Sequence, residues 1–187
     1  SVPVINGLSD LTHPCQIMGD IFTVFEHKGR YEDLKIAYVG DGNNVTNSWI
    51  NLAARLSLDL RVGCPQGYEP NMDLVKKAQA EGKSEIQIFN DPFEAVKDAD
   101  VVYTDVWASM GQEEEAKARK KIFMPFQVND KLIAAADNDC LVLHCLPAHR
   151  GDEITDDVID GPHSVVFDEA ENRLHIQKAI MVRLMKK

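Results

Sequence analysis

The stretch KIAYVGDGNNVTNSWINLAARLSLDLRVGC, residues 35–64, contains the pattern that decides the fold. It opens with the short apolar run KIAYVG, which ends in glycine as a buried strand often does. VTNSWINLAARLSL then places apolar residues near helical spacing, and LDLRVGC is a second apolar run that Pro65 breaks. The order strand, helix, strand predicts two parallel strands joined by a helix.

The same alternation continues toward the C-terminus. Three more strands of this kind are predicted at residues 85–90, 100–106 and 140–145. A sixth short strand, SVVFDE, is predicted at residues 164–169, and a terminal amphipathic helix at residues 172–187. Helical segments separate the strands, and one of them ends at Gly82. We therefore predict an α/β fold with a doubly wound, mostly parallel, Rossmann-like sheet that has helices on both faces.

Composition excludes several classes of protein. The 187 residues carry a net charge of −10 with no basic block, which argues against a nucleic-acid or anionic-membrane partner. No apolar run reaches the ~20 residues that a membrane span requires, and the first residues lack the features of a signal peptide. The cysteines are scattered without a CxxC pair, which argues against a disulfide framework or a structural zinc site. We expect a cytoplasmic protein.

The first predicted strand ends in GDGNNV, residues 40–45. Ligands of parallel α/β sheets bind beyond the carboxyl ends of the strands, so this segment is a candidate site. Gly-x-Gly between a strand and a helix is typical of dinucleotide sites. However, Val45 stands where the third glycine belongs, and the second strand ends at Cys64-Pro65 with no acid for a ribose. NAD binding is thus the weakest hypothesis, and Asn44 either caps the helix or offers its amide to a small polar ligand.

The fourth predicted strand ends at Asp105, where a carboxylate must be solvated, paired or used. Ser109 and Met110 follow shortly after it, before a charged segment. One interpretation is that Asp105 or Ser109 caps the next helix. The other is that a carboxylate and a hydroxyl together recognise an ammonium group.

The fifth predicted strand ends in HCLP, and its first two residues are His144 and Cys145. Adjacent strand residues point to opposite faces, so these two cannot form a catalytic dyad with each other. One should face the core and the other the site, although a cysteine in the core is also common. The bond between Leu146 and Pro147 is a candidate cis peptide.

Near the start of the chain, THPCQ predicts the beginning of a helix, since Pro14 suits the first helical position. The amide groups at such a helix start carry partial positive charge, and His13 and Gln16 offer directed hydrogen bonds. A polar oxygen is the natural ligand, and an ordinary helix start is the alternative.

Together, HPCQ, GDGNN, DVWASMG, HCLPAHRG and FDEAENR resemble the ornithine carbamoyltransferases. The resemblance covers nearly the whole chain, in the order and with the spacing of that family. HPCQ alone fits transcarbamylases in general, whereas DxxxSMG together with HCLP indicates ornithine rather than aspartate as the acceptor. The family's reaction transfers a carbamoyl group from carbamoyl phosphate to the side-chain amine of L-ornithine, and gives L-citrulline and phosphate. It uses no metal and no organic cofactor.

The resemblance also implies roles for individual residues. His13 and Gln16 would polarise the carbamoyl oxygen as negative charge develops on it. Cys145 would orient the reacting amine without a covalent intermediate, and with Asp105 it completes the expected catalytic set. Ornithine is expected to contact Asn44, Asp105, Ser109 and Met110. Carbamoyl phosphate is expected to contact His13, Pro14, Cys15, Gln16, Cys145, Leu146 and Arg173.

Members of this family carry a first domain before HPCQ, with a Ser-x-Arg-Thr-Arg motif that binds the phosphate, and nothing in this chain matches it. The resemblance therefore assigns residues 1–28 to an interdomain helix region, residues 29–170 to the ornithine-binding domain and residues 171–187 to a helix that packs on the absent domain. We expect negligible transferase activity from this chain alone, because that domain brings the reactants together. The intact enzyme is expected to be a homotrimer or a multiple of it.

The absent domain has a further expected consequence for the first helix. Its apolar residues should be partly exposed or repacked; these are Ile17, Ile21, Phe22, Val24 and Phe25. Gly19 stands where the family has alanine, and we expect it to weaken the helix without touching any residue assigned to a ligand.

Two other functions stay open. A carbamoyltransferase for another amine is one, although the presence of Ser109-Met110 argues against it. A non-catalytic module that binds a basic amino acid is the other, since the phosphate-binding motif is absent from this chain.

Overall fold

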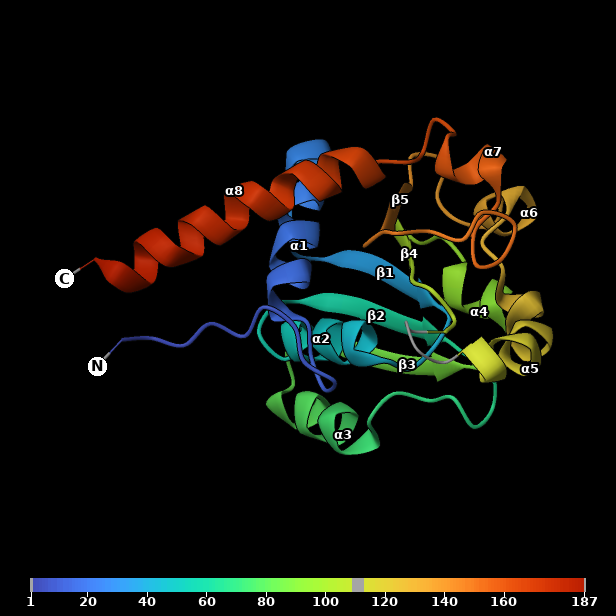
Figure 1. Cartoon of the computed structure of the whole chain (residues 1–187), viewed down its shortest axis with the longest axis horizontal. Helices are drawn as coiled ribbons and strands as arrows, with labels where there is room; N and C mark the ends of the chain where they lie inside the picture. Colours follow the sequence, from blue (N-terminus) through green and yellow to red (C-terminus); the bar gives the residue numbers. More distant parts are fainter. Residues whose placement is uncertain (1, 109–112, 187) are drawn as a thin grey trace.

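A five-stranded parallel sheet forms the centre of the molecule (Figure 1). The structure is a computed structural model that describes residues 2–108 and 113–186. The strands are β1 (Leu34–Val39), β2 (Leu58–Gly63), β3 (Glu85–Phe89), β4 (Val101–Thr104) and β5 (Leu141–His144). Their order in the sheet is β3-β2-β1-β4-β5, and every pairing is parallel. The strand order reverses between β1 and β4, which is where sheets of this kind bind their ligands.

Helices cover both faces of the sheet, so the predicted doubly wound α/β fold is confirmed. Alternate residues of β1 show the two faces. Ile36 and Tyr38 pack with α1 (Pro14–Lys28), α2 (Asn44–Ala53) and α3 (Met72–Glu81). Ala37 and Val39 belong to a second core on the opposite face. The helices that contribute to this second core are α4 (Pro92–Val96), η1 (Met124–Phe126), α6 (Asp130–Ile133), α7 (Asp156–Ile159) and, through Val166, the start of the C-terminal helix.

Two further helices complete the fold, α5 (Glu113–Phe123) and α8 (Val166–Met185). The predicted helix stop at Gly82 is confirmed, because Gly82 ends α3 with a left-handed φ of 68°. None of the described helices is both long and apolar enough to cross a membrane.

The predicted sixth strand is wrong. Residues 164–169 make only a single bridge to the sheet, between Ser164 and Val142, and α8 begins at Val166. The buried residues of α8 are Val166, Glu169 and Asn172, which recur every third position as one face of a helix requires. The buried residues therefore follow a helical period, and the two valines of SVVFDE do not continue as a strand.

Helix α8 lies across α1 (Figure 1), whose apolar side chains pack on the sheet. Ile17, Ile21 and Val24 are buried, so the expected exposure is confined to Phe22 and Phe25. Gly19 lies in this contact, because a Cβ at that position would be 3.2 Å from the Arg173 Cδ. The expectation that Gly19 touches no residue assigned to a ligand is therefore wrong.

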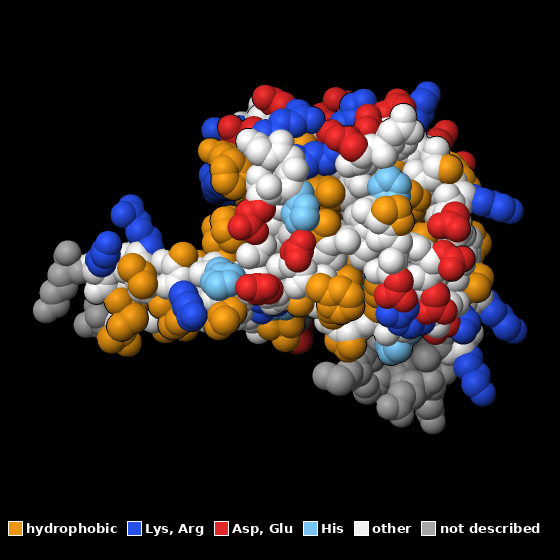
Figure 2. Space-filling model, turned by 90° about the horizontal axis from the view of Figure 1, so that it is seen from above, with side chains coloured by type: hydrophobic (Ala, Val, Ile, Leu, Met, Phe, Trp, Pro, Cys, Tyr) orange, Lys and Arg blue, Asp and Glu red, His pale blue; other side chains and the backbone are white. Residues whose placement is uncertain are grey.

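Beyond α1, the second half of α8 projects from the body of the molecule with hydrophobic side chains on its surface (Figures 1 and 2). The exposed apolar residues of this half are Met181, Val182, Leu184 and Met185. The first residues of the chain expose Val2, Val4, Leu8 and Leu11 in the same way. The two ends of the chain thus carry the apolar residues exposed on this side of the molecule.

Candidate functional site at the strand ends

Asp105 is the centre of a hydrogen-bonded cluster beyond the carboxyl ends of β1, β4 and β5. Its side chain is almost fully buried. Oδ2 accepts a hydrogen bond from Asn43 Nδ2 at 2.6 Å, and Oδ1 accepts one from Cys145 Sγ at 3.0 Å. The backbone N–H of Val106 also donates to Oδ1, at 2.7 Å. The cluster thus joins the segments that follow three strands at the switch point of the sheet.

The amide orientation of Asn43 follows from its position as the N-cap of α2. Its Oδ1 accepts from the backbone N–H groups of Val45 and Thr46 and from the Tyr38 hydroxyl. The amide nitrogen must therefore point the other way, where it donates to Asp105. The Asn43 side chain therefore both caps α2 and donates a hydrogen bond to Asp105.

Asn44 does not cap the helix, so that alternative is wrong. Its Nδ2 instead donates to the carbonyl of Ser9 at 2.8 Å. Sequence reasoning singled out Asn44 and missed Asn43. Both asparagines follow the first strand, and only the turn geometry shows which one reaches Asp105.

Gly42 explains why this turn is not a dinucleotide site. A Cβ on Gly42 would lie 2.3 Å from the backbone of both Glu69 and Pro70. The space that a pyrophosphate uses in a Gly-x-Gly turn is therefore filled by the chain itself. This packing agrees with the valine at position 45 in place of a third glycine, which also argues against NAD binding.

Cys145 is a neutral thiol in this cluster. Burial, followed by the negative charge of Asp105, raises the pKa of Cys145 well above its usual value. The thiol donates to Asp105, and the thiolate that a nucleophilic mechanism needs is disfavoured. The arrangement suits a positioning group and not a covalent catalyst.

We expect the substitution Asp105→Asn to speed the alkylation of Cys145 by iodoacetamide at pH 8. Removing the adjacent charge lowers the thiol pKa, and each unit raises the thiolate fraction about tenfold. The rate is measured by peptide mass spectrometry, with the exposed Asp157→Asn as the matched control. Cys64, whose pKa burial raises to about 12, serves as an internal reference that should not change. A Cys145 that already reacts as fast as free cysteine in the unaltered chain would contradict this result.

His144 faces the core, as predicted for one residue of the HC pair, and it is fully buried. The N–H of Leu146 donates to its Nδ1 at 2.9 Å, so its proton is on Nε2, which donates to Glu153 at 3.1 Å. Glu153 also accepts the N–H of His149. These bonds hold the turn after β5, in which the Leu146–Pro147 peptide is cis as the sequence indicated.

Asp105, His144 and Cys145 are the candidate metal ligands among the described residues, with ligand atoms within 4.8 Å of one another. Both ring nitrogens of His144 already make hydrogen bonds. A metal ion would have to displace one of them and remove the proton from Cys145. The group is better described as a hydrogen-bonded cluster.

His13 lies at the start of α1, next to the strand ends. Its backbone N–H donates to Ser48 Oγ at 2.7 Å, which fixes this turn to α2. Burial, with a smaller effect of the positive charge on Arg173, lowers the pKa of His13, so the imidazole is neutral at pH 7. Its Nδ1 is buried without a partner among the described residues. A neutral imidazole with a free nitrogen can bind a polar oxygen or N–H group.

Gln16 is fully engaged inside the protein. Its Nε2 donates to Asp20 at 2.7 Å and to Glu169 at 3.0 Å, and its Oε1 accepts from Arg173. The two predicted ligand residues Arg173 and Gln16 therefore lie side by side, but they form a hydrogen bond with each other. The role of Glu169 was missed, although its position three residues after the buried Val166 placed it on the core face of a helix.

The remaining predicted residues have different surroundings. Pro14 begins α1, and Cys15 is buried with its Sγ donating to the Asn6 carbonyl. Ser109 and Met110 lie outside the described residues. After them, Arg119 of α5 is fixed by Asp41 and by the Trp107 carbonyl.

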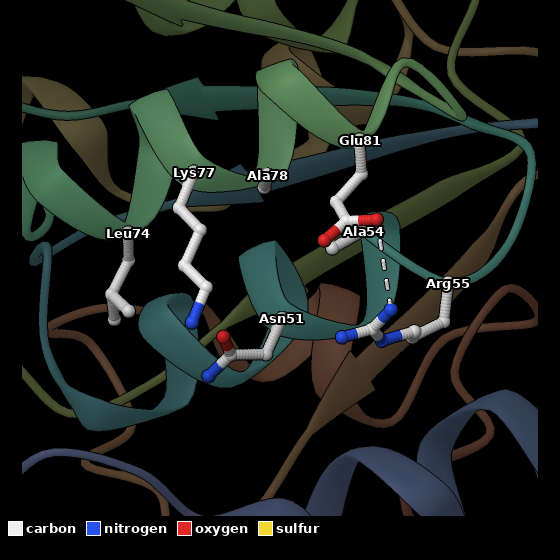
Figure 3. Close-up of a pocket in the computed structure, with 7 residues that line it drawn as sticks. All are labelled: Asn51, Ala54, Arg55, Leu74, Lys77, Ala78 and Glu81. Carbon is white, nitrogen blue, oxygen red and sulfur yellow. Dashed lines mark ion pairs between the residues drawn. The ribbon is translucent and has the colours of Figure 1, made fainter.

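A separate groove lies between α2 and α3, where the ion pair of Arg55 with Glu81 spans 3.8 Å (Figure 3). Its lining residues are Asn51, Ala54, Arg55, Leu74, Lys77, Ala78 and Glu81. It is built from the C-terminal end of α2 and therefore lies toward the amino ends of the strands. None of the predicted site residues lines it.

Most of the chain matches a known protein family. Residues 32–184 match the family model of the aspartate/ornithine carbamoyltransferase Asp/Orn-binding domain. The chain belongs to this family. The cluster of Asn43, Asp105 and Cys145 lies within the matched region, whereas His13 and Gln16 precede it.

Curated relatives of this chain include the ornithine carbamoyltransferase of Geobacter metallireducens, which is 63% identical over 100% of this chain and 61% of its own length. That of Thermococcus kodakarensis is 58% identical over 99% of this chain and 60% of its own length. The chain thus spans about 60% of the curated relatives that it matches.

Solved structures share this fold. The ornithine carbamoyltransferase from Pyrococcus furiosus superimposes with a TM-score of 0.93 at 55% identity, over 99% of this chain and 60% of that chain. The ornithine transcarbamoylase from Giardia lamblia gives 0.89 at 37% identity, over 97% of this chain and 62% of that chain.

Proposed function

We propose that this chain is the ornithine-binding part of an ornithine carbamoyltransferase, which forms L-citrulline and phosphate from L-ornithine and carbamoyl phosphate. The observation that carries the proposal is the buried Asp105 carboxylate at the switch point, held between Asn43 and Cys145. A carboxylate in this position can pair with the ammonium group of an amino acid. The family match and the names of the relatives support ornithine as that amino acid.

In this reaction Asp105 and Asn44 bind the amino-acid end of ornithine, together with Ser109 and Met110. The Cys145 thiol faces the side-chain amine. Because the thiol is neutral, it does not stabilise a protonated amine as a thiolate would, and this favours the neutral form of the amine. The neutral His13 binds the carbamoyl oxygen, where negative charge develops during attack.

Gln16, Arg173 and Leu146 form the remaining contacts with carbamoyl phosphate, next to Pro14 and Cys15. In the described structure Arg173 donates to Gln16. Binding of carbamoyl phosphate therefore requires that this hydrogen bond be replaced by contacts with the ligand. No metal or organic cofactor takes part in the proposed reaction.

The partner of the exposed apolar surface is the carbamoyl-phosphate domain of the longer protein. The surface consists of the projecting half of α8 and the first residues of the chain, which lie on the same side of the molecule (Figure 1). Residues 1–28 and 171–187 are then the parts that contact this domain, and residues 29–170 form the ornithine-binding domain. We further propose a homotrimeric or larger intact enzyme in the cytoplasm, and negligible activity of this chain alone.

An amide NMR titration of the chain with L-ornithine tests the proposal. We expect shifts confined to the turn after β1, to Asp105 and the residues that follow it, and to the segment from His144 to Leu146. L-aspartate and NAD are the controls. Equal shifts with aspartate, or shifts with NAD alone, would contradict the proposal.

A further inference from the structure

Two buried carboxyl groups have no role in the proposed reaction. Asp20 of α1 and Glu169 of α8 are both fully buried. Within the described part of the chain, no ion pair involves either of them. Burying an unpaired charge is costly, so both groups require an explanation.

Glu169 receives hydrogen bonds from three separate elements. Its Oε1 accepts from Gln16 Nε2 of α1 at 3.0 Å and from the Tyr103 hydroxyl of β4 at 3.3 Å. Its Oε2 accepts from the backbone N–H of His144 at 2.8 Å, at the end of β5. One side chain thus joins the predicted carbamoyl-binding glutamine to the residue that precedes Cys145.

Asp20 makes fewer contacts. Its Oδ1 accepts from Gln16 Nε2 at 2.7 Å, and its Oδ2 has no donor among the described residues. The two carboxyl groups are neighbours, because Asp20 Oδ1 and Glu169 Oε1 accept from the same Gln16 nitrogen, at 2.7 Å and 3.0 Å. Two carboxylates this close cannot both ionise inside a protein, so the pair holds a proton. The proton belongs to the pair as a whole, because burial and the neighbouring Asp20 also raise the pKa of Glu169.

The groups around the pair do not remove this proton. Tyr103 of β4 and Cys145 after β5 have pKa values raised by burial and are neutral. Arg173 of α8 is the nearby cation, and its Nη1 donates to Gln16 and not to either carboxyl group. Helix α2 contributes no titratable side chain.

We propose that Asp20 and Glu169 share one proton and act as positioning residues, which fix Gln16 and the His144–Cys145 backbone in one arrangement. The roles of Gln16 and Cys145 rest on the proposed function, whereas the shared proton does not. Loss of the proton places two buried negative charges side by side and separates α1 from α8, which displaces Gln16.

The proposal predicts a pH dependence with a definite sign. Burial raises the pKa of Asp20 to about 7 from its ordinary value of 3.8. The folded state therefore holds the proton more tightly than the unfolded state does. The free energy of unfolding falls as the pH rises from about 4 to about 7, and the stabilising form of the pair is present below this range.

The test is an NMR titration of the unliganded chain from pH 5 to pH 9. We expect the Gln16 side-chain amide and the backbone N–H of His144 to shift together with one midpoint near neutral pH. In Asp20→Asn the amide group replaces the protonated carboxyl and donates to Glu169, so both signals should keep their low-pH positions up to pH 9. Absence of the shift in the unaltered chain, or its persistence in Asp20→Asn, overturns the proposal.

The substitution Glu169→Gln tests the positioning role. An amide at this position turns a donor toward Gln16 or His144, so we expect the signals of Gln16, His144 and Cys145 to move at every pH. Glu171→Gln is the matched control, because Glu171 lies on the same helix with its side chain 73% exposed. Equal effects of the two substitutions overturn the proposal. None of these measurements uses ornithine, so a failure of this proposal can be told apart from a failure of the proposed function.

Discussion

Replacing Trp49 with alanine is expected to lower the free energy of unfolding by about 3–5 kcal/mol. Trp49 is fully buried in α2, and its ring packs against the edge of Tyr103 at a centroid distance of 5.6 Å. Tyr103 also stacks on Tyr38 and donates to Glu169. A cavity at Trp49 therefore weakens the sheet core and loosens a group that supports the site. Urea unfolding followed by far-UV circular dichroism measures the effect.

Two controls separate cavity formation from other causes. The indole Nε1 of Trp49 has no partner among the described residues, so Trp49→Phe loses no hydrogen bond and should cost much less than the alanine variant. Phe93→Ala removes an aromatic ring that is 48% exposed, and its effect should be small. A Trp49→Ala variant as stable as Phe93→Ala would show that this core is not packed as described.

The substitution Asp105→Asn is expected to weaken ornithine binding by about 10- to 100-fold. A hydrogen bond to a charged group contributes about 1.5–3 kcal/mol, and about 1.4 kcal/mol corresponds to a factor of ten in affinity. An asparagine keeps the shape of the side chain but has no charge to pair with an ammonium group. The dissociation constant is obtained from the same NMR titration that tests the proposed function.

Asp157→Asn again serves as the matched control, since this carboxylate is exposed on α7. Thermal unfolding of both variants checks that the strand-end cluster has not simply come apart. If Asp105→Asn binds ornithine with unchanged affinity while remaining folded, the carboxylate is not the group that recognises the ammonium, and the site assignment fails.

The strands of the sheet could be predicted because their signal is local. Runs such as KIAYV and CLVLHC are apolar on both faces, and glycine or proline ends them. The failure at SVVFDE has the same origin, because a short apolar run does not distinguish a strand from the first turn of a buried helix. Only the packing of Val166 and Glu169 against the rest of the molecule decides it.

The fold class, the family resemblance and the three strand ends that meet at Asp105 follow from the sequence alone. Each of these depends on residue order along one segment, or on the rule that parallel strands end at the same edge. Only the folded structure shows which asparagine reaches Asp105, why Gly42 is needed, and that Asp20 and Glu169 are buried next to the same Gln16 side chain. These depend on distances between residues far apart in the chain, such as Gln16 and Glu169. Burial and the approach of charges set them, and neither quantity exists before the chain has folded.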